Sequence, residues 1–201
     1  MSKEGLYSML VELPKKENEY LSGLTRFVGK GMNLNYQEDN FFHLTLKKTS
    51  YCDNRNARVD LKNWIEMQEP FELTLDTIGK FNHRNGTILY LTTSDLEKRN
   101  KIIDLHDGIK KFTKSEVFGQ QNNSKFVPHV TLFHEIPKEK SGEVKEKIIQ
   151  NIEPISLTIS SVLVRKKVDD YNWKNFGRFN LGTDYWTIEN FYKPQMVEAR
   201  V

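Results

Sequence analysis

The fold of this chain is decided by FVPHVTLF, residues 126–133, and by a counterpart nearer the N-terminus, FFHLTL, residues 41–46. Each is an apolar run in which a His and a Thr stand two positions apart. Successive side chains of a β-strand point to opposite faces, so the His and the Thr share one face and apolar residues take the other. Such a strand is expected to pack its apolar face in the core and to line a polar cleft with its other face. The four motif residues are His43, Thr45, His129 and Thr131.

Chance is a poor explanation for this pair of motifs. The chain holds 5 His, so two His-x-Thr triplets within apolar runs would seldom coincide by accident. Pro128 stands directly before the second triplet, and Pro is tolerated at the first residue of a strand. A single His in an apolar strand is more often a hydrogen-bonded core residue than a catalyst. Because two such motifs occur in this chain, we favour the interpretation that both His residues belong to one catalytic site.

In these features the chain resembles the 2H phosphoesterase superfamily, which is named for two His-x-Thr/Ser motifs on strands of two pseudo-symmetric lobes. Residues 126–133 match the Phe-x-Pro-His-x-Thr-Leu form of the second motif. Residues 71–81 resemble the middle segment of the family, and residues 160–166 with 179–182 resemble its closing hairpin. One departure is His134, five positions after the second motif His, where relatives often carry an Arg that contacts phosphate.

The resemblance covers residues 6–182 and implies an α+β fold of the LigT-like kind with two pseudo-symmetric lobes. Mainly antiparallel sheets would line a central cleft, and the helices would lie outside. With 201 residues the chain is long enough for one buried core. We expect residues 1–182 to form this one domain and residues 183–201 to be a C-terminal extension, to which the sequence assigns no role.

Periodicity and turn signals predict the elements along the chain. Residues 17–28 have the apolar spacing of a helix, which Gly29 and Gly31 are expected to end. Ser94 and Glu97 form a capping box that opens a helix ending near residue 112. The other predicted elements are strands at residues 6–13, 41–48, 71–81, 87–93, 126–133, 155–167 and 176–181, and helices at 59–67 and 143–151, the last capped by Ser141.

Two imidazoles in one cleft are suited to moving protons at neutral pH, because an unperturbed His titrates near a pH of about 6.5. A neutral imidazole removes a proton from the attacking hydroxyl or water, and a charged one gives a proton to the leaving oxygen. Thr45 and Thr131 are expected to donate hydrogen bonds to the non-bridging phosphate oxygens. The sequence leaves open which of His43 and His129 is the base.

The resemblance implies a metal-independent phosphodiesterase that cleaves 2′,5′-linked or cyclic oligonucleotides, such as 2′,5′-oligoadenylate alarm signals. Opening of 2′,3′-cyclic phosphates at RNA ends and the reverse, joining reaction are alternatives within the class. A binding module that holds a nucleotide without turnover is an alternative of another class. A metal hydrolase is disfavoured, because no His-x-x-x-His or Cys-x-x-Cys spacing accompanies the motifs. We expect neither a metal nor a cofactor.

Four further residues are candidates for substrate binding. Lys47 falls on the same face as the first motif pair, where its ammonium would help to hold a phosphate. Tyr171 and Trp173, near the last hairpin, are candidates to stack on a base, since the family often uses an aromatic residue there. His134 occupies the position of the family's phosphate contact.

Composition restricts the partners and the compartment. With 37% hydrophobic and 28% charged residues the chain has the composition of a soluble globular protein, and no apolar run is long enough to cross a bilayer. A net charge of +3 does not indicate a long nucleic-acid duplex, so we expect a short oligonucleotide or cyclic nucleotide as substrate. Cys52, the single Cys, forms no internal disulfide, and its local sequence supplies no Cys/His signature that would indicate a nucleophile. We expect a monomer in the cytoplasm, that of the host if the chain comes from a virus or phage.

Overall fold

The computed structural model describes residues 5–36, 41–50, 55–113, 125–169 and 172–183. Its strands are β1 (Leu6–Glu12), β2 (His43–Ser50), β3 (Phe71–Leu75), β4 (Thr77–His83), β5 (Gly86–Thr92), β6 (Val130–Ile136), β7 (Ile155–Ile159), β8 (Ser161–Lys167) and β9 (Trp173–Asn180). Its helices are α1 (Lys15–Met32), α2 (Arg55–Glu66), α3 (Leu96–Phe112) and α4 (Ser141–Ile149). Cys52, Tyr171 and residues 184–201 lie outside the described residues.

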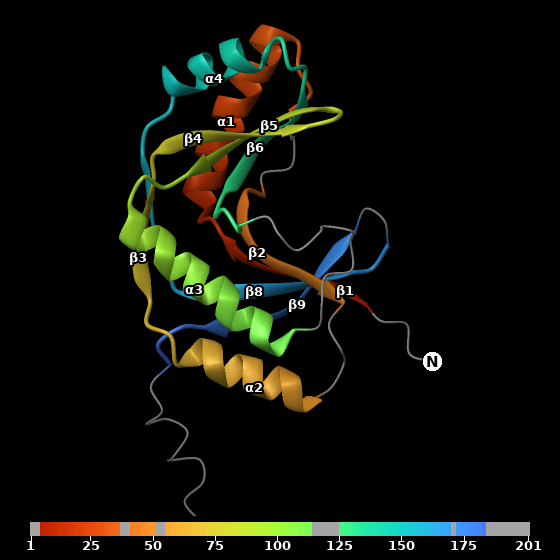
Figure 1. Cartoon of the computed structure of the whole chain (residues 1–201), viewed down its shortest axis with the longest axis vertical. Coiled ribbons are helices and arrows are strands. Elements are labelled where there is room, and N and C mark those ends of the chain that lie inside the picture. The colour runs from red at the N-terminus through yellow and green to blue at the C-terminus, as the bar shows by residue number, and fades with distance from the viewer. Residues whose placement is uncertain (1–4, 37–40, 51–54, 114–124, 170–171, 184–201) are drawn as a thin grey trace, which may run out of the picture.

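Seven strands form one antiparallel sheet in the order β4-β5-β6-β2-β1-β8-β9. At its middle, β2 and β6 are joined in register at Leu44 and Val130, and the sheet divides there into two parts. Helices α1 and α4 pack on β4, β5 and β6, and we call this part the β6 lobe. The other four strands form the β2 lobe, in which α3 packs on β2 and α2 packs on β9. Figure 1 shows the β6 lobe above the β2 lobe. The predicted α+β fold with two antiparallel lobes is confirmed.

Strand β1 supplies much of the core of the β2 lobe. Its odd-numbered residues Tyr7, Met9 and Val11 are at most 3% exposed. Burying apolar side chains of this size stabilises a fold by about 1.5–3 kcal/mol each. The even-numbered residues of β1 point to the other face of the sheet, the face that also carries His43.

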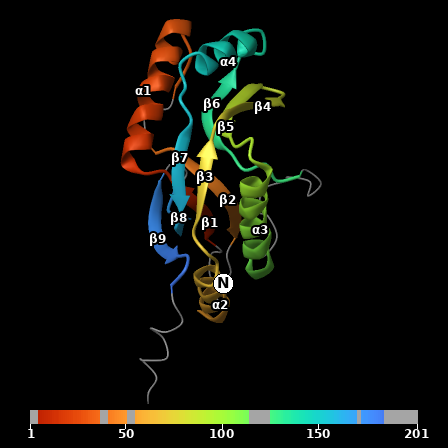
Figure 2. The ribbon, with the colours of Figure 1, turned by 90° about the vertical axis from the view of Figure 1, so that its left-hand side faces the viewer.

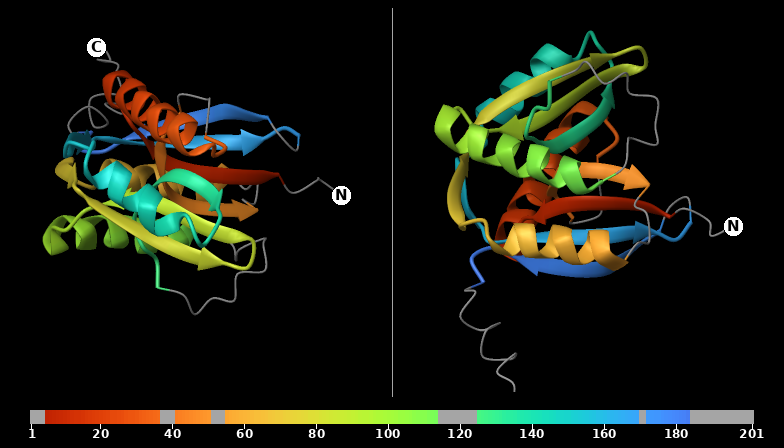
Figure 3. Two further views of the ribbon diagram at one scale, coloured as in Figure 1. Left: turned by 90° about the horizontal axis from the view of Figure 1, so that it is seen from above. Right: turned by 60° about the horizontal axis from the view of Figure 1, so that its bottom comes forward.

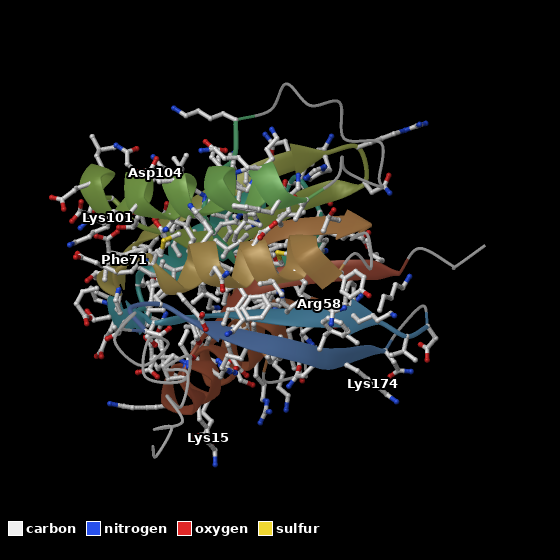
Figure 4. All side chains as sticks on the ribbon, turned by 90° about the horizontal axis from the view of Figure 1, so that it is seen from below. Lys15, Arg58, Phe71, Lys101, Asp104 and Lys174 are labelled. Atoms are coloured by element: carbon white, nitrogen blue, oxygen red, sulfur yellow. The ribbon has the colours of Figure 1, made fainter. Side chains whose placement is uncertain are left out.

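Helices α2 and α3 lie next to each other over the outer face of the β2 lobe (Figure 3). Gly108 of α3 permits this approach, since a Cβ there would lie 1.9 Å from the ring of Trp64 in α2. Arg58 of α2, labelled in Figure 4, lies 4.5 Å from the centre of the Phe176 ring in β9. None of the described helices is long and apolar enough to span a membrane.

The two long predicted strands, 71–81 and 155–167, are each divided between two sheets. The first breaks at Asp76 into β3 and β4, and the second breaks at Ser160 into β7 and β8. β3 and β7 pair with each other as a separate two-stranded sheet that runs between the lobes (Figure 2). Alternation of apolar and polar residues marks a strand but not the sheet it joins, so the pattern runs through both breaks.

Helix α1 runs past the two glycines that the sequence predicts as its end. It continues through Gly29 and Gly31 and ends at Asn33, whose φ of 51° lies in the left-handed region. Gly29 is buried under the ring of Tyr36, and a Cβ at Gly29 would lie 2.6 Å from that ring. This glycine therefore serves close packing rather than helix termination.

The predicted caps of α3 and α4 are wrong by one residue. Ser94 donates its N–H and its hydroxyl to the carboxylate of Asp76. Asp95 caps α3 instead, because its side chain accepts a hydrogen bond from the N–H three residues on. Ser141 is the first residue of α4 rather than its cap, and its hydroxyl donates to the carbonyl of Lys138. Several polar side chains near a helix start can cap it, and the sequence does not rank them.

Candidate active site

The four motif residues come together where the two lobes meet. Leu44 of β2 and Val130 of β6 are paired in antiparallel register, and both are buried. Residues next to such a pair point to the opposite face, so the two His and the two Thr emerge side by side on that face. Each His lies opposite the Thr of the other strand, and all four side chains are half-buried. We call this the motif face.

Both motif imidazoles are held by the same backbone contact. Nδ1 of His43 lies 3.1 Å from the carbonyl oxygen of Phe41, and Nδ1 of His129 lies 2.7 Å from that of Val127. A carbonyl oxygen only accepts hydrogen bonds, so Nδ1 carries the hydrogen in both rings. The neutral rings therefore keep Nε2 as an acceptor, and Nε2 is the atom able to take up a proton.

Burial lowers the pKa of both motif histidines below the usual value for His. At His43 the backbone hydrogen bond opposes this shift, and the charges of Lys48 and Arg165 lower the pKa further. At His129 the backbone hydrogen bond also opposes the shift, while His134 and Lys48 lower the pKa further. Both imidazoles thus favour the neutral form, and a bound phosphate anion would favour protonation of one of them.

An aromatic pair holds the ring of His129. The rings of Phe81 and Tyr90 stack with centres 4.3 Å apart, and each centre lies 5.1 Å from the centre of the imidazole. Tyr90 is paired in register with Thr131, and its ring lies over Gly79, where a Cβ would be 2.3 Å from it. Neither aromatic residue was predicted as part of the site, because alternation along a strand does not show which other strand lies beside it.

On the other side of the site, Arg165 of β8 and Phe41 flank His43. The ring centres of Phe41 and His43 are 5.0 Å apart, and the Arg165 guanidinium lies 4.6 Å from the Phe41 ring centre. Nη2 of Arg165 donates to the backbone oxygen of Trp173 at 3.0 Å. Trp173 pairs in register with Lys167, so its half-buried ring shares the face of Arg165. Arg165 was not among the predicted site residues.

Side chains from other elements fix the segments that lead into the two motifs. Asn18 of α1 accepts a hydrogen bond from the Phe42 N–H and donates to the carbonyl of Leu13 at 2.6 Å. Thr92 of β5 donates to the carbonyl of Pro128 at 2.6 Å. The residue before each motif His is therefore tied to a buried polar side chain.

A β-bulge at Leu46 changes the face of the residues that follow the first motif. Thr45 and Lys47 pair with successive residues of β1, so Leu46 is the extra residue. Lys47 consequently faces away from the motif face and is 5% exposed, and Lys48 takes the place predicted for Lys47. The predicted position of Lys47 is wrong, because the period of two holds only along a regular strand.

The same bulge recurs at Leu132 in the second motif strand. Thr131 and Phe133 pair with successive residues of β5, so Leu132 is extra. Phe133 is buried in the core, and His134 returns to the motif face, where it is exposed. The structure thus brings predicted residue His134 near the motif residues.

A polar pocket of about 570 Å³ adjoins the site at Phe41. Glu12, which pairs in register with His43, lines the pocket and forms an ion pair with Arg178. Arg178 also donates to the hydroxyl of Ser161 at 2.9 Å. The pocket therefore presents both charges and a hydroxyl beside Phe41.

Two further histidines are described. His106 of α3 stacks on Phe126 with ring centres 4.0 Å apart, and its Nδ1 lies 2.9 Å from Oδ1 of Asp107. His83 is exposed at the end of β4. In the part of the chain that the structure describes, no three His, Cys, Asp or Glu side chains are grouped so as to hold a metal ion.

A two-lobed α+β fold with His-x-Thr motifs on two paired strands defines a 2H phosphoesterase. The sequence model of the 2′-5′ RNA ligase superfamily matches residues 38–170, which is more than half of the chain. The chain therefore belongs to the 2′-5′ RNA ligase superfamily. Members of this superfamily are phosphoesterases and ligases, which makes this chain an enzyme of the class that acts on phosphodiesters.

Solved structures share the fold at low sequence identity. E. coli LigT complexed with 3′-AMP has a TM-score of 0.61 and 16% identity, over 89% of this chain and 99% of that chain. The Thermus thermophilus protein TT0787 has a TM-score of 0.62 and 14% identity, over 88% and 98% of the two chains. Kluyveromyces marxianus Usb1 has a TM-score of 0.58 and 8% identity, over 87% and 99%. No curated protein sequence matches the chain.

Proposed function

We propose that the chain is a metal-independent phosphodiesterase that cleaves 2′,5′-linked or cyclic oligonucleotides through proton transfer by His43 and His129. The observation that supports this most is the register of Leu44 with Val130, because it sets both imidazoles on one face. The hydrogen bonds of the two Nδ1 atoms leave both Nε2 atoms available for proton transfer. Two such groups suit a reaction in which one proton is removed and another is supplied.

In the proposed cleavage of a 2′,5′ linkage, the neighbouring 3′-hydroxyl attacks phosphorus, helped by the large effective molarity of a group already held beside it. The hydroxyl proton passes to Nε2 of the neutral His, the bond from phosphorus to the 5′-oxygen breaks, and the charged His protonates that oxygen. Water then opens the resulting cyclic phosphate with the two roles exchanged. The hydroxyls of Thr45 and Thr131 donate to the non-bridging oxygens, whose negative charge grows in the transition state.

The surroundings of His43 supply the binding part of this proposal. The pocket of about 570 Å³ beside Phe41 offers room for a nucleoside on this side of the phosphate. Trp173 shares the face of Arg165 and is our candidate to stack on a base. Tyr171, the other candidate, stays a prediction.

A second candidate function is the opening of 2′,3′-cyclic phosphates at RNA ends, either by water or by a 5′-hydroxyl, which joins two RNA ends. The match to a family described as 2′-5′ RNA ligases favours it. Joining reverses the cleavage step described above, because a 5′-hydroxyl takes the place of water, gives its proton to one His and attacks the cyclic phosphate, while the other His protonates the ribose oxygen that leaves. The same residues would serve both reactions, so the identity of the product decides between them.

A substrate panel tests the proposal. Purified wild-type protein and the variants His43→Ala and His129→Ala are incubated, in the presence of a chelator, with 2′,5′- and 3′,5′-oligoadenylate, cyclic oligonucleotides and RNA ending in a 2′,3′-cyclic phosphate. Products are resolved by mass. Cleavage of a 2′,5′-linked or cyclic member by wild type alone supports the proposal. Tight binding of a nucleotide without any product would contradict the proposal and indicate a binding function instead. Activity that returns only with an added metal would contradict the metal-independent mechanism.

A further inference from the structure

Two residues occupy equivalent positions on the two motif strands. In each strand the Leu after the motif Thr forms the bulge, so the residue five positions after the motif His turns to the motif face. On β2 this residue is Lys48, and on β6 it is His134. Lys48 is placed on the motif face by its pairing with Ser8. His134 follows the last paired residue before a second register shift, and its effect on the pKa of His129 places it near the motif residues.

The surroundings of Lys48 differ from those of the neighbouring Lys47. Lys48 pairs in register with Ser8 of β1, which in turn pairs with Arg165, so the three lie in one row on the motif face. Lys48 is exposed and, among the described residues, makes no ion pair. Lys47 lies on the opposite face, and its ammonium is thereby separated from the motif residues.

Besides burial, the positive charge of Lys48 lowers the pKa of each of the three histidines on the motif face, His43, His129 and His134. It lowers the pKa of His43 and of His129, in addition to the larger effect of burial. Desolvation lowers the pKa of His134, the charge of Glu135 opposes this, and Lys48 lowers it further. Lys47 instead contributes to the lowered pKa of His106, on the other side of the sheet, where burial is again the larger cause.

These positions matter because the motif face has to bind an anion. A phosphodiester carries one negative charge, and the phosphorane formed from it carries more. The attraction between a fixed cation and the non-bridging oxygens therefore increases as the reaction proceeds. His43 and His129 favour the neutral form and supply little positive charge before substrate binds. A third neutral imidazole at His134 would supply hydrogen bonds but not charge.

We propose that Lys48 binds the non-bridging oxygens of the substrate phosphate, and that His134 is its uncharged counterpart at the equivalent position of the other lobe. This proposal rests on the proposed function of the motif face. One cation near the meeting point of the lobes serves both strands, and a second would lower the pKa of the catalytic acid still further. The two motif strands are thus expected to need one cation between them, at either position, in addition to Arg165 of β8, whose guanidinium contacts Phe41 and the backbone oxygen of Trp173.

An exchange of the charge between the lobes tests this idea. Lys48→Met keeps the length of the side chain and removes its charge, so kcat/KM should fall by about a hundredfold on the substrate that the panel identifies. Adding His134→Lys to that variant should recover at least about tenfold, because the equivalent position then carries the cation. Lys47→Met is the matched control, and its kcat/KM should stay within about threefold of wild type for the folded fraction.

Binding of inorganic phosphate and of 3′-AMP, measured by calorimetry, separates this proposal from the proposed function. If no oligonucleotide is cleaved, weaker phosphate binding by Lys48→Met and its recovery in Lys48→Met/His134→Lys still support the role of Lys48. Unchanged phosphate binding and turnover in Lys48→Met would overturn the proposal. A folded double variant no better than Lys48→Met would overturn the equivalence of the two positions.

Discussion

At the residue scale, His43 and His129 are predicted to act as a unit. Replacing either with Ala removes one of two linked proton transfers, so each single variant should lose about 10³-fold in kcat. The double variant should lose little more than either single variant, because the remaining imidazole has no partner in the reaction. Single-turnover rates, with circular dichroism to confirm folding, provide the measurement. A loss in the double variant equal to the product of the two single losses would contradict the prediction.

The spacing of single residues in the sequence predicts their face only as far as the bulge of each motif strand. The spacing of His and Thr is enough to place the four motif residues on one face, because each triplet precedes the bulge of its strand. Lys47 follows a bulge, so the same reasoning assigned it to the wrong face. Phe81, Tyr90 and Arg165 touch or influence the motif histidines from other strands, and nothing in their local sequence records that contact.

At the scale of elements, the first motif strand depends on helix α1 through Asn18. Asn18→Ala removes the acceptor of the Phe42 N–H and the donor to the Leu13 carbonyl, and each buried group left unpaired costs about 1–3 kcal/mol. We expect the free energy of unfolding, measured with urea, to fall by about 2 kcal/mol or more. The backbone before His43 should also be held less firmly, and kcat should fall because the imidazole is then positioned less precisely. The control is Asn151→Ala, at an exposed site, and equal unfolding midpoints for the two variants would refute the prediction.

The elements themselves were predictable where one face is apolar and the ends are marked. The motif strands and the helix ending near Phe112 meet these conditions. The breaks at Asp76 and Ser160 do not, because β3 and β4, like β7 and β8, continue one alternating pattern while they join different sheets. What separates them is the pairing partner, which is a property of residues distant in the sequence.

At the scale of the whole molecule, the two lobes exchange helices. Helix α1 follows β1 of the β2 lobe but packs in the β6 lobe, whereas α3 follows β5 of the β6 lobe and packs in the β2 lobe. Each lobe therefore buries its core under a helix whose preceding strand belongs to the other lobe. The order of elements along the sequence is compatible with helices that stay in their own lobe, so this exchange had to come from the structure.

Burial of histidines also predicts how the stability of the whole molecule depends on pH. Burial lowers the pKa of His43, His106 and His129, and in each case a hydrogen bond opposes part of the shift. In the unfolded chain these side chains titrate near a pH of about 6.5. Below that pH the unfolded state therefore binds more protons than the folded state, and the free energy of unfolding decreases as the pH falls. Above it, the stabilising contribution of the three neutral side chains is fully present.

Urea unfolding at about pH 7.5 and about pH 5.5 measures this dependence, and the midpoint should be lower at the acidic pH. His106 lies away from the motif face, so His106→Gln separates the effect on stability from catalysis. This variant should show a smaller decrease in midpoint between the two pH values, since one fewer side chain takes up a proton on unfolding. His83→Gln, at an exposed position, is the matched control. A midpoint that is equal or higher at the acidic pH would show that the buried imidazoles do not link folding to protonation.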